Sequence, residues 1–374
     1  MPEVMRTVTP DDYERFHRFL ERCYGHGRGA FARWQPELFR EDPAADECHL
    51  ILERDGEIIS HVGAYPIPLV LGPARLTPGG IGNVATHPDH RSRGYMARLM
   101  EESVRRMRER GWSLSALWGD RQRYAHFGYE RCGLRFRVQV SRRSLDQGRV
   151  VPAEVAEVDR GDPAVVAQIA VLHSGLPYRT ERPHFGLQLA REGVRAFLGP
   201  DGYILSHGQA GGYLHVIEAA SPTERLPELV RGAMDWTFGD GAELDSGPGD
   251  TERMARVVDA MCGWHAGDQG MLRIVDWLRF LQDLQPLLQH RAAGLPPFSV
   301  SVGCRWREST DWATVDWDGQ ALAVSPERRT DGVEFELPHL TGLVCGGPHP
   351  GRERLGLLTH LLPVPVHIPG LDHV

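Results

Sequence analysis

The chain has 374 residues, a length that predicts two or three domains. Its 42 basic side chains are all arginines, with no lysine, against 50 aspartates and glutamates, and the formal net charge is -8. This acidic balance argues against a nucleic-acid-binding protein, which would carry a basic excess. It favours a cationic small molecule or amine as the partner.

The sequence carries no signal for secretion or for a membrane. No apolar stretch approaches the roughly 18 residues that a membrane span needs, and the early acidic residues Glu3, Asp11 and Asp12 do not fit a signal or transit peptide. We therefore expect a cytoplasmic protein with no membrane partner. The scattered cysteines form no CxxC pair, so we expect free thiols rather than disulfides or a thiolate zinc site.

The first block of the chain predicts a strand meander. A strand at Val4 to Val8 precedes a helix that Thr9 caps and Pro10 begins. Strand patterns follow at His49 to Glu53, Glu57 to Ala64 and Ile67 to Leu71, and their short turns indicate antiparallel pairing.

A second group of elements surrounds a glycine-bearing loop. The strand Ile81 to Thr86 leads through this loop into an amphipathic helix that runs from Met96 to a stop at Gly111. Strands are then expected at Trp112 to Trp118 and near Phe136 to Val140. Residues 144 to 162 have the composition of a linker.

The rest of the chain predicts further α+β structure. Asp162 and Pro163 begin a helix to His173, and the second block lacks a loop like that of the first. The expected elements beyond it are a hairpin of Tyr203 to His207 with Tyr213 to Ala219, helices at Glu224 to Trp236 and Trp277 to His290, and strands at Phe298 to Trp306 and Trp312 to Val324. The fold class is therefore α+β with mixed sheets. The aliphatic tail from Leu361 is either frayed or docked on the protein.

The loop Arg91-x-x-Gly94-x-Met96 is the strongest chemical signal. A glycine-bearing loop at a helix N-terminus directs unpaired backbone N–H groups and the positive helix end at one point, which suits a pyrophosphate. Arg91 and Arg93 add positive charge. The alternative for such a loop taken alone is an ordinary turn between a strand and a helix.

The segment Val84-Ala85-Thr86-His87-Pro88-Asp89-His90-Arg91-Ser92-Arg93-Gly94-Tyr95-Met96 resembles the GCN5-related N-acetyltransferases (GNAT). The resemblance implies that acetyl-CoA is the co-substrate. It assigns the pyrophosphate to Arg91, Ser92, Arg93, Gly94, Tyr95, Met96 and Ala97, and the pantetheine arm to the backbone of Val84, Ala85 and Thr86. Met96 departs from the usual glycine or alanine and narrows the space beside the helix.

The whole chain resembles the enhanced intracellular survival (Eis) type of acetyltransferase, which shares the Arg-x-Arg-Gly loop and the string Tyr124-x-x-Phe-Gly-Tyr129. This resemblance implies a GNAT domain at residues 1–143 and a second, GNAT-like domain without the phosphate loop at 144–275. It implies a sterol-carrier-like domain at 276–374. It also implies a homo-oligomer, a hexamer in that group.

The resemblance implies two catalytic groups. Tyr124 is the general acid that protonates the departing CoA thiolate, a task that suits a phenol with a reference pKa of about 10. The C-terminal carboxylate, carried here by Val374, accepts a proton from the attacking amine. Gly119 and Asp120 match positions that contact the cofactor, although a polar loop is an equal alternative.

No metal is expected. His87 and His90 have a ligand-like spacing but no third partner in sequence, and the absence of lysine excludes a P-loop ATPase. Gly80-Ile81-Gly82 lacks the third glycine of a dinucleotide-binding fingerprint.

The function expected from these signals is acetyl transfer from acetyl-CoA to a primary amine, such as an aminoglycoside, a polyamine or a lysine-like peptide group. The alternative is a non-catalytic module that binds acyl-CoA or lipid.

Overall fold

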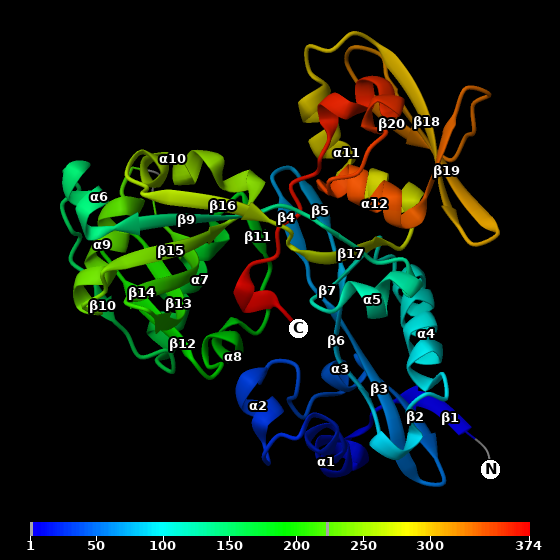
Figure 1. Ribbon diagram of the computed structural model, residues 1–374, viewed down its shortest axis with the longest axis horizontal. Helices are drawn as coiled ribbons and strands as arrows, with labels where there is room; N and C mark the ends of the chain where they lie inside the picture. The colour runs from blue at the N-terminus through cyan, green and yellow to red at the C-terminus, as the bar shows by residue number, and fades with distance from the viewer. Residues whose placement is uncertain (1–2, 222–223) are drawn as a thin grey trace. The chain divides into compact units, whose positions relative to one another are not determined.

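The computed structural model describes residues 3–221 and 224–374, which form a mixed α and β structure (Figure 1). Contacts divide the chain into two compact units. The first contains residues 3–133, 270–364 and 374, and the second contains 134–269 and 365–373. The α+β fold class with mixed sheets is confirmed. In the described residues, no helix is both long and apolar enough to span a bilayer.

A seven-stranded sheet forms the centre of the first unit. Its strands, in spatial order, are β1 (Glu3–Thr7), β2 (His49–Arg54), β3 (Glu57–Pro66), β6 (Gly79–Thr86), β7 (Leu114–Leu117), β17 (Gly270–Ile274) and β8 (Glu130–Cys132). The pairs β1–β2, β2–β3 and β3–β6 are antiparallel, which confirms the predicted pairing of the strands at His49 to Glu53 and Glu57 to Ala64. The third strand of the predicted meander is wrong in its position, because Leu69–Leu71 forms β4, which pairs with β5 (Ala74–Leu76) in a separate sheet. The pair β6–β7 is parallel.

Two helices cover opposite faces of this sheet. Leu50 and Leu52 of β2 pack with α4 (Tyr95–Glu109), whereas Ile51 between them packs with α1 (Tyr13–Tyr24). Alternate side chains of a strand point to opposite faces, so each helix buries its apolar stripe on its own side. The smaller elements near this sheet are η1 (Pro10–Asp12), α2 (Ala30–Trp34), α3 (Pro43–Asp46), β4 (Leu69–Leu71) and β5 (Ala74–Leu76).

The predicted start of α1 is confirmed, with one addition. Pro10 opens the short turn η1, and the Asp12 carboxylate accepts hydrogen bonds from the Thr9 N–H and hydroxyl, both at 2.9 Å. Gly25 ends α1 in the left-handed region with φ 71°.

The first unit also contains the segment after β17. Its sheet has the order β20 (Leu322–Ser325), β19 (Ser309–Trp317), β18 (Phe298–Trp306) and β21 (Val333–Glu336), beside α11 (Trp277–Ala292) and α12 (Leu337–Cys345). The predicted helix and strands are present, and Gly319 turns the chain between β19 and β20 with φ 100°. The α12 helix packs on β17 and β8, and the Gly133 N–H donates to the Cys345 carbonyl at 2.8 Å.

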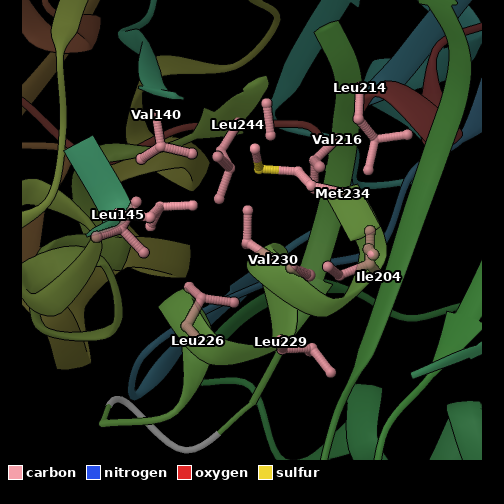
Figure 2. Packing of buried hydrophobic residues seen from close by; sticks show 14 of the residues in the cluster. Val140, Leu145, Ile204, Leu214, Val216, Leu226, Leu229, Val230, Met234 and Leu244 are labelled. Atoms are coloured by element: carbon pink, nitrogen blue, oxygen red, sulfur yellow. The ribbon is translucent and has the colours of Figure 1, made fainter. Parts of the chain in front are cut away.

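The second unit is built on its own seven-stranded sheet, in the order β10 (Ala156–Glu157), β12 (Val194–Leu198), β13 (Tyr203–Ala210), β14 (Tyr213–Ala220), β15 (Gly241–Ser246), β9 (Arg135–Ser141) and β16 (Gly263–Gly267). Its helices include α6 (Arg142–Gln147), α7 (Pro163–Ser174), α8 (Phe185–Leu189), α9 (Leu226–Trp236) and α10 (Thr251–Asp259). Figure 2 shows the apolar side of α9 packed with residues of the strands and α6.

Two strands lie where the chain order does not predict them. The strand expected near Phe136 to Val140 is β9, which pairs with β15 and β16 in the sheet of the second unit. Conversely, β17 lies between β7 and β8 in the sheet of the first unit. The proposed three-domain division stays a prediction, because these two discontinuous units do not test its boundaries.

The predicted linker at 144 to 162 is wrong in part. Ser141 caps α6, which extends into this segment, by accepting a hydrogen bond from the Ser144 N–H at 3.1 Å. Leu145, Val150 and Val155 are buried in the core of the second unit. The mixed charge of this segment, together with Gly148 and Pro152, obscured these apolar positions, which have no helical or strand period.

Candidate active site

The predicted loop leaves β6 and enters α4 with an unusual backbone. Ser92 and Gly94 have positive φ angles of 62° and 78°, and Gly94 is the residue that immediately precedes the first turn of α4. The first turn has no acidic residue. Its free N–H groups and the positive end of the helix therefore favour an anion.

The loop arginines are exposed, and each also contacts the backbone. The Arg91 Nε donates to the Thr86 carbonyl, and the Arg93 Nη2 donates to the Asp89 carbonyl, both at 3.3 Å. These bonds hold the two side chains near the loop while other guanidinium N–H groups face solvent. Tyr95 differs, because its ring is buried and its hydroxyl donates to Glu3 at 3.0 Å. Tyr95 therefore offers only its backbone to a ligand.

Strand β6 has an open edge beside this loop. Its pairing with β7 ends at Ile81, opposite Leu117, although β6 continues to Thr86. A register shift in its pairing with β3 and a φ of 53° at Asn83 mark a β-bulge at this point. Unpaired backbone groups on this edge suit an extended polar ligand chain. The Val84 carbonyl accepts a hydrogen bond from the Tyr24 hydroxyl at 2.9 Å.

A groove of about 950 Å³ joins the open strand and the loop. Every predicted cofactor residue of the strand and loop lines it: Val84, Ala85, Thr86, Arg91, Ser92, Arg93, Gly94, Tyr95, Met96 and Ala97. Sequence reasoning missed its other lining residues, which are Cys23, Tyr24, His90, Glu101, Arg123, His126, Phe127 and Arg307. The size lies within the usual range for ligand pockets, and the open strand, anion-binding turn and arginines fit acetyl-CoA.

Gly119 and Asp120 do not line this groove. A side chain at Gly119 would clash with the Tyr124 ring, so this glycine makes room for the tyrosine. The Asp120 carboxylate caps the short helix α5 (Arg121–Tyr124) by accepting from the Gln122 N–H at 2.9 Å. Both residues thus support the position of Tyr124, and their contact with the cofactor stays a prediction.

Tyr124 is the last residue of α5, and its ring lies against Gly119, two residues beyond the end of β7. The residue is only 8% exposed, and burial raises the pKa of its phenol. The hydroxyl is therefore protonated at neutral pH. Its ring makes an edge contact with Tyr129, at 6.5 Å between centroids. Tyr129 is fully buried with its hydroxyl 2.7 Å from the Ser115 hydroxyl, as expected for a packing residue.

The terminal residue Val374 belongs to the first unit and lies against β6. A β-carbon added at Gly82 would be 2.6 Å from the terminal carboxyl carbon, and one added at Gly80 would be 2.7 Å from the valine Cγ2. These two glycines accommodate the end of the chain. The terminal carboxyl thus lies one residue beyond the last β6–β7 pair, Ile81 with Leu117.

The preceding tail residues are docked in the second unit, which confirms the docked alternative. Leu371 is in an apolar core, and the buried Asp372 carboxylate accepts hydrogen bonds from Thr180, Arg182 and Gln188 at 2.6 to 2.9 Å. Burial alone would raise the pKa of Asp372, but the charge of Arg182 lowers it on balance. Asp372 is therefore ionised, and its ion pair holds the tail.

A family model described as an acetyltransferase (GNAT) domain matches residues 4–132, the segment that contains β6, the loop, α4 and Tyr124. Residues 4–132 are a GNAT acetyltransferase domain. The protein is therefore an acetyl-CoA-dependent acyltransferase. Among curated proteins, no sequence matches the chain.

Solved structures share the fold beyond the GNAT domain. A GCN5-related N-acetyltransferase from Kribbella flavida has a TM-score of 0.72 at 20% identity, with 100% of this chain and 98% of that chain covered. A probable N-acyltransferase from Enterococcus faecalis V583 gives 0.70 at 18%, covering 92% and 90%. Eis1 from Mycobacterium abscessus gives 0.67 at 16%, covering 100% of both chains. At these identities the likeness shows the fold alone.

Proposed function

We propose that this acetyltransferase transfers the acetyl group of acetyl-CoA directly to a primary amine, without a covalent enzyme intermediate. The proposal rests on the positions of two groups. The terminal carboxyl lies against Gly82 of β6, and the Tyr124 ring lies against Gly119, just beyond β7. The two strands are no longer paired at these positions. The proposed base lies against β6, and the proposed acid lies against the segment that follows β7.

The proposed roles are a base at Val374 and an acid at Tyr124, whose phenol keeps its proton because burial raises its pKa. The Val374 carboxylate accepts a proton from the amine nitrogen as the nitrogen bonds to the acetyl carbonyl carbon. The carbon–sulfur bond breaks, and the Tyr124 hydroxyl donates its proton to the thiolate. Acetyl-CoA supplies the activated thioester, while the amides of 94 to 97 and the edge of 84 to 86 orient it. The products are the amide and CoA.

The acceptor that we propose is a small cationic amine, such as an aminoglycoside, a polyamine or a lysine-like group. The net charge of -8 favours the approach of cations. The Eis-like assembly as a homo-oligomer, the cytoplasmic location and the sterol-carrier-like character of residues 276–374 stay predictions. The non-catalytic alternative is not retained, because residues 4–132 match an acetyltransferase domain.

The acid is tested by Tyr124→Phe. This change keeps the ring that fills the space at Gly119 but removes the proton, so we expect kcat to fall roughly 10²-fold or more with little change in the acetyl-CoA affinity. The measurement is thiol release with a panel of amines, beside Tyr129→Phe as the matched ring variant. An unchanged kcat for Tyr124→Phe would rule out the acid role.

The base is tested by adding two glycines after Val374. The new peptide bond converts the carboxylate at Gly82 into a neutral amide, so we expect kcat to fall by about 10²-fold while acetyl-CoA still binds. The same glycines placed before Met1 are the control. Full activity of the C-terminally extended chain would contradict the proposed base.

A further inference from the structure

A second cavity, of about 260 Å³, adjoins the cofactor groove in the first unit. It shares Glu101, Phe127 and Arg307 with the groove, so the two spaces meet at these residues. Its other lining residues are Met100, Val104 and Arg105 of α4, Arg273 of β17, and Trp306 of β18. The β18–β19 hairpin therefore supplies one wall of this cavity, although it lies far from the GNAT domain in sequence.

Arg273 is the unusual residue of this cavity. It is only 8% exposed, and its Nε has no hydrogen-bond partner. Its Nη1 donates to the Phe127 carbonyl, and in the described residues no carboxylate pairs with it. Burial lowers the pKa of this guanidinium. Removing a cation from water without a counter-charge is costly, so Arg273 favours the binding of an anion beside it.

Among the residues that line the cavity, three arginines stand beside one carboxylate. Arg307 donates to Glu101 at 2.7 Å, which compensates the only acidic group of the lining. The guanidinium groups of Arg273 and Arg307 lie 4.9 and 5.6 Å from the centroid of the Trp306 ring. Arg105 adds a further cation, although Glu102 and Glu109 of the same helix bind it.

We propose that this cavity binds the 3′-phosphate on the adenosine end of CoA, with Arg273 and Arg307 as its cationic partners. The inference rests on the proposed function, because it assumes that the pyrophosphate lies at the α4 N-terminus. Glu101 lies two helical turns beyond Gly94, roughly 10 Å along the axis. The phosphorylated ribose follows the pyrophosphate directly in CoA, so it reaches this part of α4. The β18–β19 hairpin thereby becomes part of the cofactor site.

The test compares CoA with 3′-dephospho-CoA by titration calorimetry, which needs no turnover. Charge-assisted hydrogen bonds predict that the wild-type protein binds CoA about tenfold to hundredfold more tightly than 3′-dephospho-CoA. Arg273→Met is expected to reduce this preference to near unity by weakening CoA alone. The control is Arg108→Met, because Arg108 pairs with Asp311 nearby but does not line the cavity.

Two results would overturn the inference: equal affinities of the wild-type protein for both ligands, or equal weakening of both by Arg273→Met. If Arg273→Met does not fold, Arg307→Met tests the same preference from an exposed position, and an unchanged preference there also overturns it. Acetyl transfer is measured separately. If the protein transfers acetyl groups but binds CoA and 3′-dephospho-CoA equally well, the proposed function stands and the cavity assignment fails. If it prefers CoA but acetylates no amine, the cavity assignment stands and the proposed function fails.

Discussion

Two buried histidines, His49 of β2 and His61 of β3, have their rings beside each other. The His49 Nδ1 and the His61 Nε2 are 3.2 Å apart, while the opposite nitrogens contact the Leu38 and Asn83 carbonyls at 2.8 and 2.7 Å. Those carbonyls can only accept, so each ring keeps its proton on that side. Burial lowers the pKa of His49 to about 4 and that of His61 well below its ordinary value. Both rings are therefore neutral in the folded protein.

This pair predicts loss of stability in mild acid. The unfolded chain takes up protons below about pH 6.5, but the folded chain resists until about pH 4 at His49, so the free energy of unfolding falls as the pH drops through this window. For His49, the free energy of unfolding at pH 5 is lower than at neutral pH by about 2 kcal/mol, and His61 adds to this loss. Urea midpoints at pH 7 and pH 5 should show a smaller acid loss for His49→Gln than for the exposed control His26→Gln. Identical acid losses would contradict this.

Local sequence patterns predict some residues of the site but not others. Arg91 to Ala97 are predictable because the loop and helix signals are local, and all line one groove. In the sequence, Gly80 and Gly82 resemble only an incomplete dinucleotide fingerprint, yet both accommodate the terminal residue in the structure. Their spacing indicates a β-strand with two adjacent positions cleared on one face. The partner that fills that space lies almost 300 residues away, so no local pattern names it.

At the scale of the element, α4 has a left-handed glycine at each end. Gly94 and Gly111 have φ angles of 78° and 73°, and an added β-carbon would meet nothing within 4 Å at either position. An alanine at either position would cost about 1 kcal/mol of stability, because the backbone holds the residue in the left-handed region, which a β-carbon disfavours. Only Gly94 lines the cofactor groove.

The two glycines form a matched pair for a prediction. Gly94→Ala and Gly111→Ala should lower the unfolding free energy by a similar amount, about 1 kcal/mol. Gly94→Ala alone should raise the KM for acetyl-CoA, by about tenfold, because it shifts the amides of the first turn. Steady-state kinetics beside thermal unfolding separate the two effects. A similar rise in the KM for acetyl-CoA in both variants would contradict a specific role of the Gly94 loop in binding acetyl-CoA.

Elements were predictable where their signals are local, and their pairing was less so. The ends of α1, α7 and β18 follow from caps and periodicity. The insertion of β17 between β7 and β8 joins residues about 150 positions apart. The apolar run that predicts a buried strand does not say which strands lie beside it, because any apolar strand of suitable length has such a run. Strand order thus depends on packing of the whole sheet, which periodicity does not encode.

At the scale of the whole molecule, the sheet of the first unit depends on this returning strand. Leu272 of β17 is 1% exposed, and β17 pairs with β7 on one side and β8 on the other. A fragment of residues 1–143 would leave both neighbours as unpaired apolar edges, which promotes aggregation. We expect this fragment to show no cooperative thermal transition by circular dichroism, unlike the full chain. A soluble fragment that binds CoA with the affinity of the full chain would contradict this.

Under the proposed mechanism, the base is a backbone carboxyl group and not a side chain, and it lies against Gly82. Any residue at position 374 could carry such a group, so the identity of the side chain there matters less than the position of the carboxyl. A chemical change of this carboxyl, such as amidation, would therefore act as an active-site mutation without altering any side chain of the groove.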